Sequence, residues 1–224
     1  MDAEEFRRLG HRLVDWIADH REGLEARPVR SVLEPGALRA RLPASPPEQP
    51  EDLDATLIDE LEELLVPALT LWQHPSWFAY FPGNASLASV LGDLVASGVG
   101  QTGIHWQASP ALTELEEVTV DWLRQLVGLS PAWHGVLQDT ASTSTLVALV
   151  CARERSTDHA AARGGLQAES APLVVYTSRE SHSSVEKAAA LAGFGREHLR
   201  LIATDAAHAL DADALARAVE EDRA

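Results

Sequence analysis

The carboxyl-terminal third of the chain alternates short apolar runs with helical patterns, and this order limits the possible folds more than any other feature. Residues 172–177 and 199–203 are rich in aliphatic and β-branched side chains. A helical pattern over 180–192 separates them, and Asp211 is expected to cap a final helix. This order predicts an α/β fold with a parallel sheet. Only two or three strands are visible, so the sheet is expected to be incomplete, with exposed edges and an uncovered apolar face.

The amino-terminal part of the chain predicts two amphipathic helices that have no core of their own. Apolar side chains fall at helical spacing over residues 2–26 and about 52–66, and Asp2 with Glu5 resembles a capping box. Six prolines between residues 28 and 50 predict an extended connector rather than a packed element. Both helices must therefore bury their apolar faces against the rest of the chain or against a partner subunit.

Three further helices are predicted over about 86–97, 109–126 and 141–155. The second opens with Ser109-Pro110, and its apolar side chains are expected to face inward: Leu112, Leu115, Val118, Trp122, Leu123 and Leu126. The single cysteine, Cys151, falls among the apolar residues of the third helix and is expected to be buried rather than reactive. The polar residues 156–170 are expected to form a surface loop.

Composition excludes several functions. The net charge of −16 disfavours a nucleic-acid partner or an anionic membrane surface, because either would be repelled over most of the protein. The longest nearly apolar stretch, 87–100, is too short to cross a bilayer, and the charged amino terminus lacks the apolar core of a secretory signal. A cytoplasmic location is therefore expected. One cysteine and scattered histidines provide no set of metal ligands, so no metal site is expected.

A hydroxyl-rich stretch, residues 139–145, lies between the short apolar run Val136-Leu137 and a helical pattern. Small hydroxyl residues at a helix start leave backbone N–H groups unpaired and add O–H donors, and the helix dipole favours negative charge there. The composition therefore suits a phosphate-binding site. An ordinary Ser/Thr cap is the simpler interpretation of this stretch taken alone.

Aromatic side chains are concentrated in one segment. Five of them lie between Trp72 and Phe81, whereas aromatic residues make up 5% of the whole chain. Such a cluster can be a buried anchor, a contact between subunits or a wall for a flat ligand. A buried anchor is the default interpretation, and a ligand wall needs independent support.

Six motifs, in this order, resemble one family. They are Glu5-Phe6-Arg7-Arg8, Val32-Leu33-Glu34-Pro35-Gly36, the segment from His74 to Pro82, the segment from Trp106 to Glu116, the segment from Gly135 to Ser142, and the segment from Ser181 to Ala188. Together they resemble the group II pyridoxal-phosphate-dependent amino-acid decarboxylases, of the aromatic-L-amino-acid decarboxylase kind. The resemblance implies an aspartate-aminotransferase-like (fold type I) PLP-dependent transferase fold, incomplete and preceded by an N-terminal helical segment. It covers the whole chain but only about the first half of such an enzyme.

The resemblance also implies a division of the chain and a set of site residues. Residues 1–85 would be a helical dimerisation segment with its proline-rich connector, and residues 86–224 the first part of the large PLP-binding domain. Thr140, Ala141 and Ser142 would hold the phosphate of pyridoxal 5'-phosphate, and His182 would stack on its ring as a catalytic residue. The residues implied for the substrate side-chain pocket are Trp72, Tyr80, Phe81, Pro82, Thr102 and Ile104. In this family some of these reach the neighbouring subunit, which implies a homodimer.

The chemistry of this family also needs a lysine that holds the cofactor as a Schiff base and an acid that keeps the ring nitrogen protonated. The motifs that carry both in the family are not found in this sequence. The single lysine, Lys187, follows His182 by five residues, about 140° round a helix, and would be aimed away from the ring. Lys187 is therefore not predicted to be the Schiff-base lysine. We expect a truncated chain, a second chain that carries the lysine, or a degenerate relative.

Two classes of function are open on this basis. One is decarboxylation of a small-molecule L-amino acid, expected to be aromatic, to the amine and CO2, with an aldehyde synthase or another amino-acid decarboxylase as a close variant. The other is a catalytically inactive fragment, or an interaction or dimerisation module of the same fold. A hydrolase that uses a serine with His182 is disfavoured, because no nucleophile elbow or ordered triad is visible.

Overall fold

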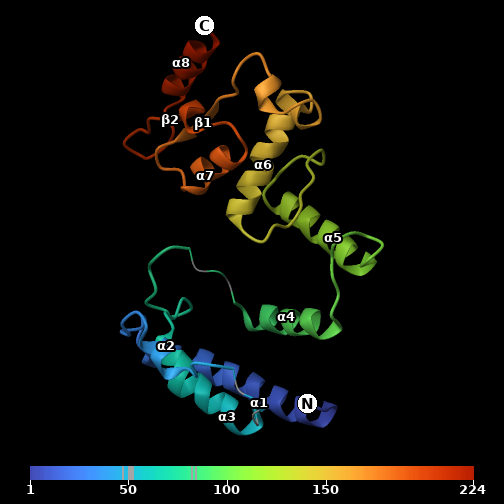
Figure 1. The fold of residues 1–224 in the computed structure, drawn as a ribbon, viewed down its shortest axis with the longest axis vertical. Helices are drawn as coiled ribbons and strands as arrows, with labels where there is room; N and C mark the ends of the chain where they lie inside the picture. The colour runs from blue at the N-terminus through green and yellow to red at the C-terminus, as the bar shows by residue number, and fades with distance from the viewer. Residues whose placement is uncertain (47, 50–52, 82, 84) are drawn as a thin grey trace. The chain divides into compact units, whose positions relative to one another are not determined.

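The computed structural model describes residues 1–46, 48–49, 53–81, 83 and 85–224. They form two compact units, Met1–Thr102 and Gly103–Ala224, and each is described by itself. Figure 1 shows the helices of the first unit and the helices and paired strands of the second. The domain boundary predicted after residue 85 is not tested by this division and stays a prediction. No helix in the described ranges is long and apolar enough to cross a membrane.

Helix α1 (Ala3–Glu22) begins at the predicted capping box. The Asp2 carboxylate accepts hydrogen bonds from the N–H groups of Glu4 and Glu5 at 2.8 and 2.9 Å. In return, the Glu5 carboxylate accepts the Asp2 N–H at 2.7 Å. These bonds satisfy N–H groups that a helix start leaves unpaired. The helix ends at Gly23, and the 3₁₀ turn η1 (Leu24–Ala26) completes the predicted segment.

The proline-rich connector contains the short helix α2 (Ala37–Arg41), so the prediction of a connector without a packed element was wrong here. Gly36 precedes the helix with a φ of +94°, a left-handed conformation that favours glycine, and it turns the chain into the helix. Residues 36–42 are free of proline, which lets one helical turn form. The Arg41 guanidinium donates a hydrogen bond to the carbonyl oxygen of Glu63 at 3.1 Å, which joins this turn to the later helical segment.

The second predicted helix changes its hydrogen-bonding pattern along its length. It comprises α3 (Leu53–Glu60), the π-helical turn η2 (Leu61–Leu65) and the 3₁₀ turn η3 (Val66–Ala68). Pro67 lies in the last turn, where its missing N–H ends the helix, as predicted. The predicted start at residue 52 lies outside the described residues. Helix α4 (Leu87–Val99) follows, and its Ser86 cap accepts the Ser89 N–H at 3.1 Å.

A polar cluster around Glu62 joins the segments of the first unit. The Glu62 carboxylate accepts a hydrogen bond from the indole N–H of Trp16 at 2.7 Å and two from the Arg27 guanidinium, each at 3.0 Å. The hydrogen bond from Arg27, assisted by that from Trp16, holds the pKa of Glu62 below its usual value. Glu62 therefore ties α1 and the residue after η1 to η2.

The second unit contains the predicted parallel sheet. Its main elements are α5 (Pro110–Leu126), α6 (Ala141–Ser156), β1 (Val175–Ser178), α7 (Ser184–Leu191), β2 (Leu199–Ile202) and α8 (Ala212–Arg223). The two strands are parallel, with Val175 opposite Leu199, and α7 connects them. Asp211 caps α8 by accepting the Ala214 N–H at 2.9 Å. The predicted order of strand, helix, strand and helix is confirmed, with two strands in the described part of the chain.

The core of this unit lies where α7 meets α6. Ala189, Ala192 and Phe194 expose only 1, 2 and 7% of their surfaces. Partly buried aliphatic side chains from α6, β2 and the region of β1 pack against them: Leu146, Leu149, Val150, Leu173, Val175 and Leu199. The small side chains of α7 let it approach α6 closely, as close-packed interiors require.

Two predictions of burial were wrong. The apolar face of α5, predicted to face inward, is largely exposed: Leu115, Trp122 and Leu126 expose 63, 61 and 81% of their surfaces. Cys151 on α6 is exposed as well. Helical periodicity identifies an apolar face but does not reveal what covers it, and none of the described residues buries these side chains.

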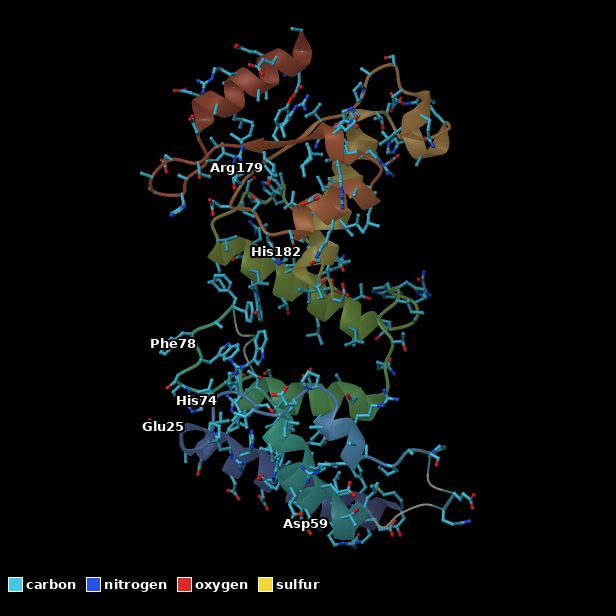
Figure 2. All side chains as sticks on the ribbon, turned by 60° about the vertical axis from the view of Figure 1, so that its left-hand side comes forward. Glu25, Asp59, His74, Phe78, Arg179 and His182 are labelled. Atoms are coloured by element: carbon cyan, nitrogen blue, oxygen red, sulfur yellow. The ribbon has the colours of Figure 1, made fainter. Side chains whose placement is uncertain are left out.

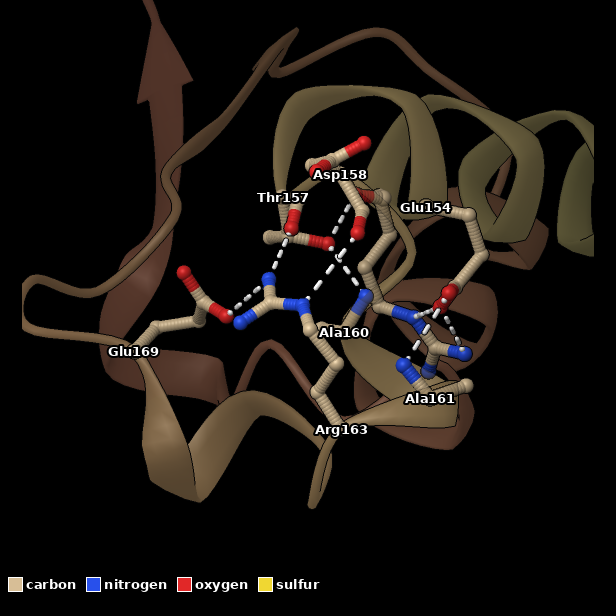
Figure 3. A network of polar contacts seen from close by, with 8 residues as sticks. Glu154, Thr157, Asp158, Ala160, Ala161, Arg163 and Glu169 are labelled. Carbon is tan, nitrogen blue, oxygen red and sulfur yellow. Dashed lines mark hydrogen bonds and ion pairs between the residues drawn. The ribbon is translucent and has the colours of Figure 1, made fainter.

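The polar segment after α6 is not the simple surface loop that was predicted. It contains two 3₁₀ turns, η4 (Ala160–Ala162) and η5 (Leu166–Ala168). Thr157 and Ala160 are buried, exposing 5 and 1%. Arg163 fastens the segment by donating to the carbonyl oxygens of Thr157 and Asp158 and to the Glu169 carboxylate (Figure 3). Polar composition hid this order, because the polar groups bond within the segment.

The substitution Glu62→Gln is expected to destabilise the first unit by about 1 kcal/mol, because it removes a charge-assisted bidentate pair that solvent only partly screens. A lower midpoint of thermal unfolding, followed by circular dichroism, measures the loss. The pKa of Glu62 is lower in the folded than in the unfolded state. Its contribution to the free energy of unfolding is therefore fully present above the unfolded pKa, near 4.5, and disappears as pH falls through the folded pKa. Glu63→Gln changes the neighbouring carboxylate and is the control. Equal midpoints for the two variants would contradict the prediction.

Candidate functional site

The start of helix α6 carries the predicted hydroxyl-rich turn. Thr140 is extended, with φ −145° and ψ 158°, and its Oγ1 accepts the Thr143 N–H at 3.2 Å. Thr140 Oγ1 also lies 3.1 Å from the hydroxyl of Thr143. The ordinary cap interpretation is therefore confirmed for Thr140. It does not exclude an anion site, because one cap satisfies only one of the N–H groups in the first turn.

The remaining donors of this turn can receive a phosphate. The N–H groups of Ala141 and Ser142 and the hydroxyl of Ser142 have no hydrogen-bond partner among the described residues, and both residues are exposed. The first turn holds no acidic side chain, and the last turn holds Arg153 and Arg155, as the helix dipole favours. Unpaired, exposed donors at the positive end of a 16-residue helix fit a phosphate group.

His182 lies in the loop between strand β1 and helix α7 (Figure 2). Hydrogen bonds hold its side chain in place. Its Nδ1 accepts the Ser184 N–H at 3.2 Å and lies 3.0 Å from the Ser184 hydroxyl. This contact assigns the proton of the neutral ring to Nε2. Ser184 is buried whereas His182 is exposed, so the ring has a fixed edge and an open face. Such a ring can stack on a flat ligand.

Arg179 is a candidate that the sequence analysis did not identify. It directly follows β1, its N–H donates to the Ile202 carbonyl at 3.2 Å, and its exposed guanidinium lies at the same strand end as His182 (Figure 2). Ligands of open α/β sheets bind beyond the carboxyl ends of the strands. A basic residue immediately after a predicted strand was the available signal.

Three aromatic rings of the first unit form one cluster. The ring centroids of Trp72 and Tyr80 lie 5.6 Å apart at 15°, and those of Trp72 and Trp77 lie 5.2 Å apart at 31°. Trp77 and Tyr80 complete the triangle at 6.2 Å. Tyr80 has a φ of +56°, a costly left-handed conformation for a bulky residue that often marks a functional site. Trp77 was not among the predicted pocket residues, and its place in the aromatic segment was the only signal.

The other predicted pocket residues do not join this cluster. Phe81 exposes 98% of its surface and lies outside the ring cluster of the first unit, and its predicted place in a substrate pocket stays a prediction. Thr102 is the last residue of the first unit, and Ile104 lies in the second with 74% exposed. Pro82 lies outside the described residues.

Lys187 lies on α7 and is exposed. Its N–H donates to the Ser183 carbonyl at 3.2 Å, so its backbone belongs to the helix start. In the part of the chain that the structure describes, no three His, Cys, Asp or Glu side chains gather where they could hold a metal ion.

A comparison with family models identifies the family of the chain. The model of the pyridoxal-dependent decarboxylase conserved domain matches residues 35–224. The chain belongs to this family. Pyridoxal-dependent decarboxylases use pyridoxal phosphate, which confirms the predicted cofactor.

Individual relatives in the family agree. The aromatic-L-amino-acid decarboxylase of Bos taurus is 41% identical over 100% of this chain and 47% of its own length. The phenylacetaldehyde synthase of Arabidopsis thaliana is 39% identical over 99% of this chain and 46% of its own. The solved structure of Catharanthus roseus tryptophan decarboxylase with L-tryptophan superposes with a TM-score of 0.90 at 35% identity, covering 100% of this chain and 48% of that one. The predicted PLP-dependent fold is confirmed, and the chain spans about half the length of these relatives.

The substitution Ser142→Ala is expected to weaken the binding of pyridoxal phosphate and of inorganic phosphate about three- to tenfold, because it removes one charge-assisted hydrogen-bond donor. Equilibrium titration followed by tryptophan fluorescence measures the affinity. Ser144→Ala is the matched control, since the Ser144 hydroxyl donates back to the Thr140 carbonyl at 3.2 Å. Thr140→Ala would be a poorer test, because Thr140 also caps the helix. Equal affinities of the Ser142 and Ser144 variants would refute an anion site at this turn.

Proposed function

We propose that this chain is the amino-terminal part of an enzyme that decarboxylates an aromatic L-amino acid to its amine and CO2 with pyridoxal phosphate. The observation that carries the proposal is the set of unpaired donors at the start of α6, in a chain of the pyridoxal-dependent decarboxylase family. The cofactor, when bound, supplies an electron sink for bond cleavage at the substrate. The lysine that holds it covalently is proposed to lie outside these 224 residues, because their single lysine, Lys187, lies on α7 and is not predicted to face the ring.

The residues of the second unit would bind and orient the cofactor. The phosphate would be surrounded by the N–H groups of Ala141 and Ser142, the Ser142 hydroxyl and the Thr140 side chain. The dipole of α6 would offset its negative charge. His182 would stack on the ring, with its orientation set by Ser184 and its proton held at Nε2. Preorganised donors of this kind lose little entropy when the ligand binds.

An aromatic substrate is proposed from the first unit. Trp72, Trp77 and Tyr80 offer a cluster of flat apolar faces, which favours a flat side chain. Relatives named aromatic-L-amino-acid decarboxylase and tryptophan decarboxylase 2 support this class. Phe81, Pro82, Thr102 and Ile104 are also proposed as substrate-binding residues, as the resemblance implies, and the chain is proposed to form a homodimer. A cytoplasmic location is part of the proposal.

An aldehyde synthase is the second candidate, because the phenylacetaldehyde synthase of Arabidopsis thaliana is 39% identical over 99% of this chain. The two activities give different products from the same amino acid, an aldehyde or an amine. An inactive interaction module of the same fold is the remaining alternative. It predicts neither product.

The deciding experiment uses the gene product purified from its own cells. Its intact mass and any co-purifying chain are measured, and L-tryptophan or L-tyrosine is then supplied with pyridoxal phosphate. Release of CO2 with the amine supports the proposal, and release of the aldehyde supports the second candidate. A mass of 24.2 kDa with no second chain and no product would overturn both and favour the module.

The substitution His182→Asn in the active enzyme is expected to lower kcat about 100-fold, because the residue would contact the cofactor and hold a proton beside it. Steady-state kinetics and the absorption spectrum of the bound cofactor measure the effect. His208→Asn is the control, since His208 is an exposed imidazole near the same sheet, 3.9 Å from the Glu180 carboxylate. Unchanged kcat and spectrum in the His182 variant would exclude it from the cofactor site.

A further inference from the structure

A cavity of about 510 Å³ lies in the second unit, away from the site described above. Its lining comes from the end of α6, the segment between α6 and β1, and the residues at and after the end of α7. Helix α6 has 16 residues and is therefore about 24 Å long. The cavity touches its last turn through Arg153, whereas the phosphate donors lie in its first turn. The two sites are separate.

The segment between α6 and β1 forms one wall of this cavity. Figure 3 shows the polar contacts within this segment. The Thr157 hydroxyl accepts the Ala160 N–H at 3.1 Å, and the Glu154 carboxylate accepts the Ala161 N–H at 3.1 Å. Arg163 closes the segment from the other side through the bonds described for the fold. The wall is therefore held by hydrogen bonds before any ligand arrives.

Two lining glycines bring the backbone close to neighbouring side chains. Gly165 and Gly193 have φ values of +76° and +87°, which other residues rarely adopt. A Cβ on Gly165 would lie 2.6 Å from Gln167 Oε1, and one on Gly193 would lie 3.6 Å from Leu166 Cδ1. Side chains at these positions would narrow the cavity, so the glycines maintain its shape.

The base of the cavity is apolar and reaches the core. Ala160, Ala192 and Phe194 line it while exposing 1, 2 and 7% of their surfaces. Leu166 and Leu173 add aliphatic surface. The volume lies within the range of roughly 300–1,000 Å³ that is typical of small-molecule sites, which are mostly apolar with a few polar groups.

The polar groups of the lining favour an anion. They include the guanidinium of Arg153 and the imidazole of His198 but no carboxylate, although the whole chain carries a net charge of −16. Arg153 contacts the Glu154 carboxylate through Nε and Nη2, each at 2.8 Å, and donates from Nη1 to the Ala192 carbonyl at 2.6 Å. A guanidinium has five N–H groups, so two have no partner among the described residues.

We propose that this cavity binds a small monocarboxylate with an apolar body. The two remaining N–H groups of Arg153 match the two oxygens of a carboxylate, and the apolar base accepts the rest of the molecule. A dianion such as phosphate fits less well, because Glu154 already offsets the charge of Arg153. The hydrogen bond from Ala161 N–H, with that from Arg153, holds the pKa of Glu154 below its usual value and keeps it ionised. No residue of the proposed cofactor site takes part.

The experiment titrates the purified full chain with octanoate and with octan-1-ol by isothermal calorimetry. Octanoate is expected to bind one site per chain and at least about tenfold more tightly than the uncharged alcohol, because only the acid can engage Arg153. Ala161→Phe fills the cavity from its wall and is expected to weaken octanoate binding at least about tenfold. Ala162→Phe is the matched control, since Ala162 is the next residue of η4, is exposed like Ala161 and does not line the cavity.

Each outcome decides for or against the site. Selective loss of binding in the Ala161 variant, with native circular dichroism, supports it. If that variant fails to fold, Ala171→Phe at another position of the lining replaces it, and the same loss is expected. No saturable binding of octanoate, equal affinity for the alcohol, or equal binding by the Ala161 and Ala162 variants would overturn the proposal.

Discussion

The packing of α6 against α7 supports both proposed sites of the second unit. Ala188 and Ala189 expose 2 and 1% of their surfaces, so α7 presents little more than methyl groups and backbone to its neighbour. Arg153 then joins the end of α6 to the end of α7 through the Ala192 carbonyl, at 2.6 Å. A larger residue in place of Ala189 would press on the packed side chains of Leu146, Leu149 and Val150 and force the two helices apart.

Structural features that depend only on neighbouring residues in the chain were predicted correctly from the sequence. The capping box of Asp2, the cap of α8 at Asp211 and the parallel strands all follow from patterns a few residues long. Burial was predicted less well. The apolar face of α5 and Cys151 were expected inside, but a helical pattern cannot reveal which segment covers it. The turn of α2 was missed because prolines on both sides outweighed a short stretch without them.

The candidate site also has features that local sequence patterns predict and features that only the folded chain shows. The donors of Ala141 and Ser142 follow from a local pattern, and the structure leaves them unpaired as an anion site requires. The stacking of Tyr80 on Trp72 could not be predicted, because it involves the left-handed backbone at Tyr80. A tyrosine in the sequence does not predict a positive φ, so only the folded chain shows this conformation.

Arginine supplies nearly all the positive charge of this chain, and several of its guanidinium groups join segments of the backbone. Guanidinium groups bond main-chain carbonyls where segments meet: Arg41 to Glu63, Arg124 to Leu129, Arg153 to Ala192, Arg163 to Thr157 and Arg200 to Glu197. A planar fork can bond a carbonyl and a carboxylate at once, as Arg153 and Arg200 do, whereas an ammonium acts as a point charge. Arginine stays protonated and cannot form a Schiff base with a carbonyl compound. The arginine side chains therefore do not compete for an aldehyde cofactor. Lys187, exposed on α7, is the single side-chain amine of the chain.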